Sequence, residues 1–207
     1  MLDTTVRRHL DPSLQVLARW LDRPGVTPDR LTLLGLALGV GSALTAAATW
    51  WWVALVLWLA SRLCDGLDGP LARRRRTAGG TTSQAGGFLD ITADFVVYGS
   101  TVLGVAVGAS SQFDAPWLPF AAVLLAYYVN GAAFLAFSSI AERTGHQIDD
   151  GRSLSFLGGL AEGTETIVVH SFWLLLPAWS PAIAWVWAGV VALSATQRMV
   201  SGYRTLQ

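Results

Sequence analysis

Long apolar segments follow one another along most of this 207-residue chain, separated by short polar stretches. Each segment is close to the roughly 20 residues that an α-helix needs to cross the hydrocarbon core of a bilayer. Because backbone groups inside lipid must find hydrogen-bond partners within their own segment, such a chain folds as helices. We therefore predict an all-α, polytopic membrane protein with six transmembrane helices, over residues 29–48, 50–74, 86–109, 115–141, 158–178 and 181–204.

The composition favours a membrane protein over a soluble domain. Hydrophobic residues make up 53% of the chain and charged residues only 14%, which is too apolar for an ordinary soluble fold. The single cysteine, Cys64, excludes an intramolecular disulfide and is predicted to pack as an inert side chain. We expect membrane lipids as partners and no nucleic acid.

The arginines indicate the orientation. The gaps at 49, 110–114 and 179–180 contain no arginine, whereas the N-terminal segment and the other loops do. The positive-inside rule therefore predicts both termini and the longer loops in the cytoplasm. Tryptophans gather toward the opposite helix ends, as an aromatic belt would: Trp50, Trp51, Trp52, Trp117, Trp173, Trp179, Trp185 and Trp187.

The N-terminal segment, residues 1–28, differs from the rest of the chain. Between Leu10 and Leu21, apolar residues gather on one side of a helical wheel and most polar residues lie elsewhere. This pattern predicts an amphipathic helix on the membrane surface, with an ordinary soluble helix as the alternative. The chain thus divides into a cytoplasmic juxtamembrane segment, 1–28, and one membrane domain, 29–207.

Four aspartates lie where the second and third predicted helices approach the loop between them. Asp65 and Asp68 are three residues apart, and Asp90 and Asp94 are four apart, so each pair shares one helix face. If the two helices are antiparallel, all four carboxylates lie at a similar depth. Carboxylates crowded in an apolar setting need a cation, or most of them take up protons. Oxygen ligands alone favour a hard divalent ion such as Mg²⁺ or Mn²⁺.

The aspartates are part of a longer pattern that resembles the signature of the CDP-alcohol phosphatidyltransferase superfamily. Eight identities in order carry the resemblance: Asp65, Asp68, Gly69, Ala72, Arg73, Gly86, Asp90 and Asp94. One departure is the loop, because the family usually has eight residues between the Ala-Arg pair and the next glycine, and this chain has twelve. The stretches GGFLDITADFVVYG and GGLAEGTETI resemble a little-characterised bacterial branch of the superfamily.

The resemblance implies a metal-dependent enzyme of phospholipid biosynthesis. It implies transfer of a phosphatidyl group from CDP-diacylglycerol to a small alcohol, with release of CMP, at the cytoplasmic face of the inner membrane. Asp65, Asp68 and Asp90 are then chiefly ligands of two Mg²⁺ or Mn²⁺ ions, and Asp94 is a ligand that also accepts the proton of the attacking hydroxyl. A homodimer is implied as well. The alternatives are headgroup transfer from a CDP-alcohol to diacylglycerol, and a non-catalytic cation transporter.

Four further signature residues are candidates for binding the CDP moiety. Gly69 and Gly86 expose backbone that a nucleotide can approach, and Ala72 leaves space beside it. Arg73 can make bidentate contacts to phosphate. The alternatives are close helix packing for Gly69 and contact with anionic lipid headgroups for the arginine run.

The acceptor pocket is less clearly marked. Glu162 and Glu165 lie early in the fifth predicted helix and either bind the acceptor alcohol or pair with Arg143, Arg152 or Arg198. By the resemblance, members that use inositol phosphate carry arginines in this region, where this chain has Gly163 and Thr166. That difference disfavours a phosphorylated acceptor and leaves the alcohol unnamed.

Other polar residues within the helices have a structural interpretation. Tyr127, Tyr128 and Asn130 lie in the fourth predicted helix and either line a pocket or, as we favour, join helices by hydrogen bonds. His170 is predicted to be a hydrogen-bonded core residue.

Overall fold

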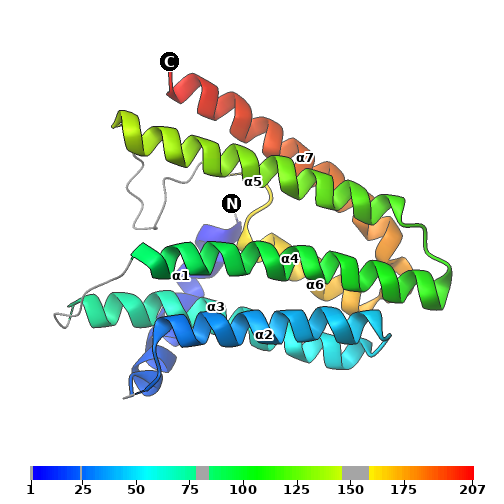
Figure 1. The fold of residues 1–207 in the computed structure, drawn as a ribbon, viewed down its shortest axis with the longest axis horizontal. Helices are drawn as coiled ribbons and strands as arrows, with labels where there is room; N and C mark the ends of the chain where they lie inside the picture. Colours follow the sequence, from blue (N-terminus) through cyan, green and yellow to red (C-terminus); the bar gives the residue numbers. More distant parts are fainter. Residues whose placement is uncertain (1, 24, 78–83, 146–158) are drawn as a thin grey trace.

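The computed structural model describes residues 2–23, 25–77, 84–145 and 159–207. Within these residues the protein is entirely helical, which confirms the all-α class (Figure 1). The helices are, in order, α1 (Leu2–Leu21), α2 (Pro28–Ala47), α3 (Trp51–Thr77), α4 (Gln84–Phe113), α5 (Leu118–Thr144), α6 (Gly163–Leu175), the short 3₁₀ helix η1 (Pro177–Trp179) and α7 (Ser180–Thr205).

Each predicted apolar helix overlaps an observed one, but the fifth is much shorter than predicted. The segment 158–178 contains α6, whose 13 residues extend about 20 Å. The helix ends at Leu175, and the next residue, Leu176, has the non-helical angles φ −128° and ψ 59°. The cause is Pro177, because the residue before a proline is disfavoured in the helical conformation.

Four segments of the described chain are long and apolar enough to cross a membrane. They are Pro28–Ala47, Ala85–Phe113, Leu118–Thr144 and Pro177–Thr205. The helices α3 and α6 are not among them, since α3 carries several charged side chains and α6 is short. The count of six spans therefore stays a prediction.

Glycines allow α2 and α4 to pack with their backbones in direct contact. A Cβ atom on Gly104 would lie 2.2 Å from the carbonyl oxygen of Ala43, and one on Gly108 would lie 2.1 Å from that of Ala46. The spacing Gly104-x-x-x-Gly108 is the small-residue pattern typical of close helix packing in membranes. Because α2 also packs along α3, it connects the two helices that carry the aspartates.

The remaining long helices form a second pair, α5 and α7, which lie side by side in Figure 1. Large aromatic residues join this pair to the other helices. Trp58 of α3, Phe120 of α5 and Trp173 of α6 are almost completely buried in one apolar cluster.

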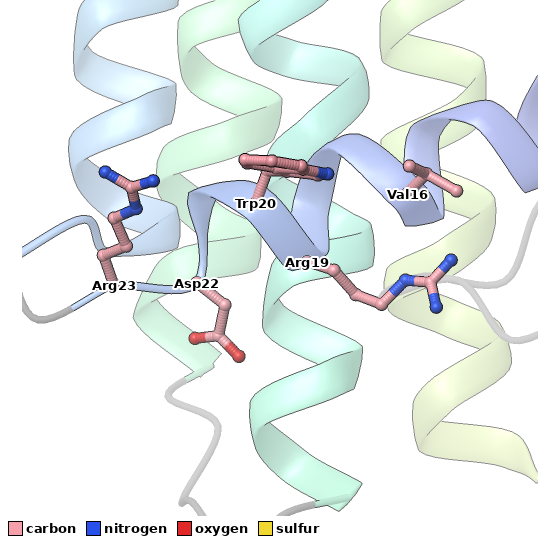
Figure 2. A pocket seen from close by; sticks show the side chains of 5 residues that line it. All are labelled: Val16, Arg19, Trp20, Asp22 and Arg23. Carbon is pink, nitrogen blue, oxygen red and sulfur yellow. The ribbon is translucent and has the colours of Figure 1, made fainter.

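The N-terminal helix α1 runs across the long helices, as Figure 2 shows. On one side, Leu14 and Leu21 pack with a buried leucine cluster of α2 and α3. On the other side, Val16, Leu17 and Trp20 are exposed. The helix is thus present, whereas its position on a membrane surface and the division into residues 1–28 and 29–207 stay predictions.

The connection from α1 to α2 is attached to the basic end of α3. Asp22 accepts hydrogen bonds from Arg74 and Arg75 at 2.9 and 3.1 Å. These bonds, the larger contribution being that of Arg74, hold the pKa of Asp22 below its usual value. Arg75 therefore takes part in structural contacts within the protein.

Candidate active site

The four aspartates lie near one another, on two helices that share α2 as a neighbour. Asp65 and Asp68 lie on α3, Asp90 and Asp94 on α4, and both helices pack on α2 with few contacts to each other. The Asp65 carboxylate lies within electrostatic range of the other three. Asp68 is 7% exposed and the others are half-buried, so the cluster is largely shielded from solvent.

Asp68, Asp94 and Asp65 each have a neutral or cationic partner within the protein. The Thr32 hydroxyl donates to Asp68 Oδ2 at 2.6 Å. Arg62 Nη1 donates to Asp94 Oδ1 at 2.6 Å and lies 3.8 Å from Asp65 Oδ2. With Asp68 and Asp94 turned to these partners, no three Asp, Glu, His or Cys side chains of the described chain form a group that could hold a metal ion.

The donor set nevertheless fits a hard divalent cation. The four side chains offer only oxygen atoms, and they are gathered in a mostly shielded place where several negative charges repel. The assignment of the four as metal ligands stays a prediction.

Arg62 is the member of the cluster that the sequence prediction missed. It is 7% exposed, and its guanidinium carbon lies 5.2 Å from the ring centre of Trp58 and 5.0 Å from that of Tyr98. A signal existed in the sequence. Arg62 is a charged residue inside an apolar segment, three residues before Asp65 and therefore on the same helix face.

The residues predicted to bind the CDP moiety lie on the same two helices. A Cβ atom on Gly69 would meet only the Arg73 guanidinium, at 3.3 Å, so no other described helix packs closely there. This contradicts the packing alternative for Gly69. Ala72 is half-buried and Arg73 is exposed. Gly86, in the first turn of α4, would place a Cβ 3.2 Å from the Asp29 carboxylate at the start of α2.

Comparison with known proteins decides the family. A family model described as CDP-alcohol phosphatidyltransferase matches residues 25–195, which contain all eight signature positions. The chain belongs to the CDP-alcohol phosphatidyltransferase family. It is therefore an enzyme of this class, a transferase of phospholipid biosynthesis, and not a non-catalytic transporter.

Curated relatives support this family assignment. The inner membrane protein YnjF of Escherichia coli (strain K12) is 41% identical over 100% of this chain and 98% of its own. The phosphatidylinositol phosphate synthase of Mycobacteroides abscessus is 32% identical over 74% of this chain and 64% of its own.

Solved structures support the fold. The phosphatidylinositol phosphate synthase PgsA1 of Mycobacterium tuberculosis with CDP-DAG bound has a TM-score of 0.72 at 22% identity, covering 92% of this chain and 93% of that one. The same synthase in complex with manganese and citrate has a TM-score of 0.70 at 24% identity, over 92% and 88%.

The predicted acceptor residues of this phosphatidyltransferase are spread over two helix ends. Glu162 is the residue before α6, and its Oε1 accepts a hydrogen bond from the Gly159 amide at 3.0 Å. Glu165 lies in the first turn of α6 and is half-buried. Arg143 is exposed in the last turn of α5, and Arg152 lies outside the described residues.

The structural interpretation of most other polar residues is confirmed. His170 is fully buried, and its Nε2 is 2.8 Å from the Tyr127 hydroxyl, which joins α6 to α5. Arg198 of α7 donates to Asn130 of α5 at 3.1 Å. Tyr128, by contrast, is exposed, and among the described residues it makes no hydrogen bond that joins two helices.

A shallow hollow lies at the C-terminal end of α1, and none of the eight signature residues lines it. Figure 2 shows the side chains that line it: Val16, Arg19, Trp20, Asp22 and Arg23. The hollow contains none of the four aspartates and is therefore separate from the predicted catalytic residues.

Proposed function

We propose that this phosphatidyltransferase uses CDP-diacylglycerol as donor and a small alcohol as acceptor, and that it releases CMP. The observation that carries the proposal is the gathering of Asp65, Asp68, Asp90 and Asp94 beside the signature glycines and Arg73. A structural neighbour with CDP-DAG bound supports the choice of donor.

In this proposal, Asp65, Asp68 and Asp90 hold divalent cations together with Asp94. Two Mg²⁺ or Mn²⁺ ions would neutralise the diphosphate and stabilise in-line displacement at phosphorus. A neighbour in complex with manganese supports a metal of this kind. Gly69, Ala72 and Gly86 leave room for the nucleotide, and the exposed Arg73 contacts phosphate.

Asp94 acts as the general base. Its Oδ1 accepts the hydrogen bond from Arg62, so Oδ2 is the oxygen that takes the proton of the acceptor hydroxyl. The hydroxyl oxygen then forms a bond to the phosphorus of the phosphatidyl group, and the bond from that phosphorus to the CMP oxygen breaks.

The proposed acceptor is an alcohol without a phosphate group. Thr166, at a position where inositol-phosphate enzymes are expected to carry an arginine, is 8% exposed and donates to the Glu162 carbonyl. A hydroxyl bonded within its own helix offers no positive charge to a phosphate. Glu162 and Glu165 would repel a phosphorylated acceptor in addition.

We further propose a multi-pass protein of the bacterial inner membrane, with six spans, a homodimeric assembly, and the active site and both termini toward the cytoplasm. The name of the E. coli relative and the four apolar segments support the location. The exposed Val16, Leu17 and Trp20 support attachment of α1 to the membrane surface.

The test is CMP release by the purified protein. With Mn²⁺ or Mg²⁺, CDP-diacylglycerol and a panel of free and phosphorylated alcohols, CMP is expected only with metal and an alcohol, and a chelator abolishes it. The lipid product then identifies the acceptor. CMP release only from a CDP-alcohol with diacylglycerol would establish the alternative, headgroup transfer to diacylglycerol. No CMP release with either pair of substrates would reject the proposal.

A further inference from the structure

We propose that Arg62 is a built-in counter-cation of the carboxylate cluster, and that its charge sets the affinity of the cluster for divalent metal. The proposal rests on the proposed metal site and concerns a residue outside the eight signature positions. The first observation is the contact of the Arg62 side chain with two of the four aspartates. The Arg62 guanidinium lies 2.6 Å from Asp94 on α4 and 3.8 Å from Asp65 on its own helix.

The guanidinium is held by the protein on its other sides as well. Nη2 donates to the Ser61 hydroxyl at 3.0 Å, and that hydroxyl donates to the Gly35 carbonyl of α2 at 2.6 Å. Arg62 is thus tied to α2 as well as to α3 and α4. An arginine whose only role was to neutralise a surface carboxylate would not need the hydrogen bonds that connect it, through Ser61, to α2.

Two aromatic rings form a slot for the guanidinium. Trp58 and Tyr98 both lie close to it, and they pack edge to face with each other at 5.9 Å. Trp58 is fully buried, stacks on His170 at 4.9 Å and donates to the Ser171 hydroxyl of α6 at 3.2 Å. A planar guanidinium stacks on such rings more closely than a lysine ammonium, although an aromatic face attracts both cations. Core packing therefore fixes Arg62 in place, independently of the carboxylates.

A fixed positive charge at this point has two opposite effects. Its charge offsets the repulsion between the Asp65 and Asp94 carboxylates, so it stabilises the cluster when no metal is bound. It also repels any divalent ion that shares these two carboxylates, because the ion and the guanidinium then lie close to each other. Removal of the charge should therefore tighten metal binding and lower the stability of the metal-free protein.

The experiment compares Arg62→Gln, Arg62→Lys and the wild-type chain in detergent, without lipid substrate. Gln removes the charge but keeps a hydrogen-bond donor toward Asp94, whereas Lys keeps the charge. Arg74→Gln is the matched control, because it removes a charge from the same helix at a residue bonded to Asp22. The readouts are the Mn²⁺ dissociation constant at pH 8, where few protons compete, and thermal unfolding with a chelator present.

Arg62→Gln is expected to bind Mn²⁺ at least about tenfold more tightly than wild type and to unfold at a lower temperature in chelator. Arg62→Lys and Arg74→Gln should stay within about threefold of wild type. If Arg62→Gln does not fold without metal, chelator competition starting from Mn²⁺-loaded protein gives the same constant. Unchanged or weaker binding by Arg62→Gln would overturn the inference. A wild-type chain that binds no Mn²⁺ would instead reject the metal site on which it rests.

Discussion

Asp94 has one carboxylate oxygen bonded to Arg62, and we proposed above that the second accepts the proton of the acceptor hydroxyl. Asp94→Asn keeps the shape and the bond from Arg62 but cannot take up a proton. We expect a folded protein that still binds CDP-lipid with metal and has lost about 10²–10⁴-fold in turnover. CMP release, measured beside a calorimetric titration of nucleotide at fixed Mn²⁺, checks this.

The control for Asp94→Asn is Asp114→Asn, which changes an exposed aspartate between α4 and α5 and should leave turnover unaffected. Asp65→Asn and Asp90→Asn should weaken nucleotide and metal binding as well as turnover. Near-normal turnover in Asp94→Asn would remove the base assignment.

Glu165 is the better candidate of the two glutamates for contact with the acceptor. Its Oε2 is buried without a hydrogen-bond partner among the described residues, whereas Glu162 Oε1 accepts from the Gly159 amide. A buried carboxylate oxygen without a partner is costly unless a ligand supplies the bond. Glu165→Gln should therefore raise the KM for the alcohol without lowering the unfolding temperature.

Glu162→Gln should leave the KM for the alcohol nearly unchanged, because an amide oxygen can still accept from the Gly159 amide. Steady-state kinetics with the alcohol varied at saturating CDP-lipid separates the two variants. A loss of stability in Glu165→Gln, with an unchanged KM, would mean that this glutamate serves the fold.

At the scale of single residues, the sequence was sufficient to predict that the four aspartates lie together. It was insufficient to predict the side chains that contact them. The spacing of Asp65, Asp68, Asp90 and Asp94 along two helices predicted that they would lie together. The role of Arg62 depends on a slot formed by Trp58 and by Tyr98 of another helix. The register between two helices cannot be predicted from the local sequence of either one.

Among the elements, α2 and α4 pack with their backbones in direct contact, and Gly104 is the residue that tests this contact. Gly104→Ala would place a methyl group against the Ala43 carbonyl, which cannot move without shifting α2. We expect a loss of about 1–3 kcal/mol in stability. The free energy of unfolding is measured in detergent. The temperature at which bound Mn²⁺ is released is then measured on the same variant.

The same helix supplies the control for this prediction. A Cβ atom on Gly99 of α4 would meet nothing within 4 Å, so Gly99→Ala should be neutral or slightly stabilising through helix propensity. Equal effects of the two substitutions would show that the contact between α2 and α4 contributes little.

The helix ends could be predicted only where local signals were strong. The range 158–178 was too long because hydrophobicity continues past the point where Pro177 ends α6. Conversely, α4 continues to Phe113 rather than 109 because no glycine or proline interrupts the residues between. The pairing of α5 with α7 had no signal, since it depends on contacts between residues far apart in the chain.

For the whole molecule, orientation in the membrane is the prediction to test. Figure 1 shows the connection between α4 and α5 at the opposite end of the helices from the C-terminus. Reporter fusions at Asp114 and after Gln207 should therefore report opposite compartments, with the C-terminal one cytoplasmic. The same compartment for both fusions would contradict the six-span arrangement.

The all-α class and the order of the helices could be predicted from the sequence, because the length of an apolar segment and the positions of the arginines are local properties. The number of spans could not be settled in this way. The charges of α3 and the shortness of α6 leave four helical segments that qualify by length and composition alone.

The aromatic slot around Arg62 has a consequence for how such an enzyme can diverge. Trp58 and Tyr98 belong to the packed interior and also touch the cation beside the four aspartates. If Arg62 sets the metal affinity as proposed, substitutions that repack this part of the interior change the metal requirement of the enzyme as well. Selection for growth on a manganese-poor medium should recover substitutions at these two aromatic positions, although neither ring bears a metal ligand.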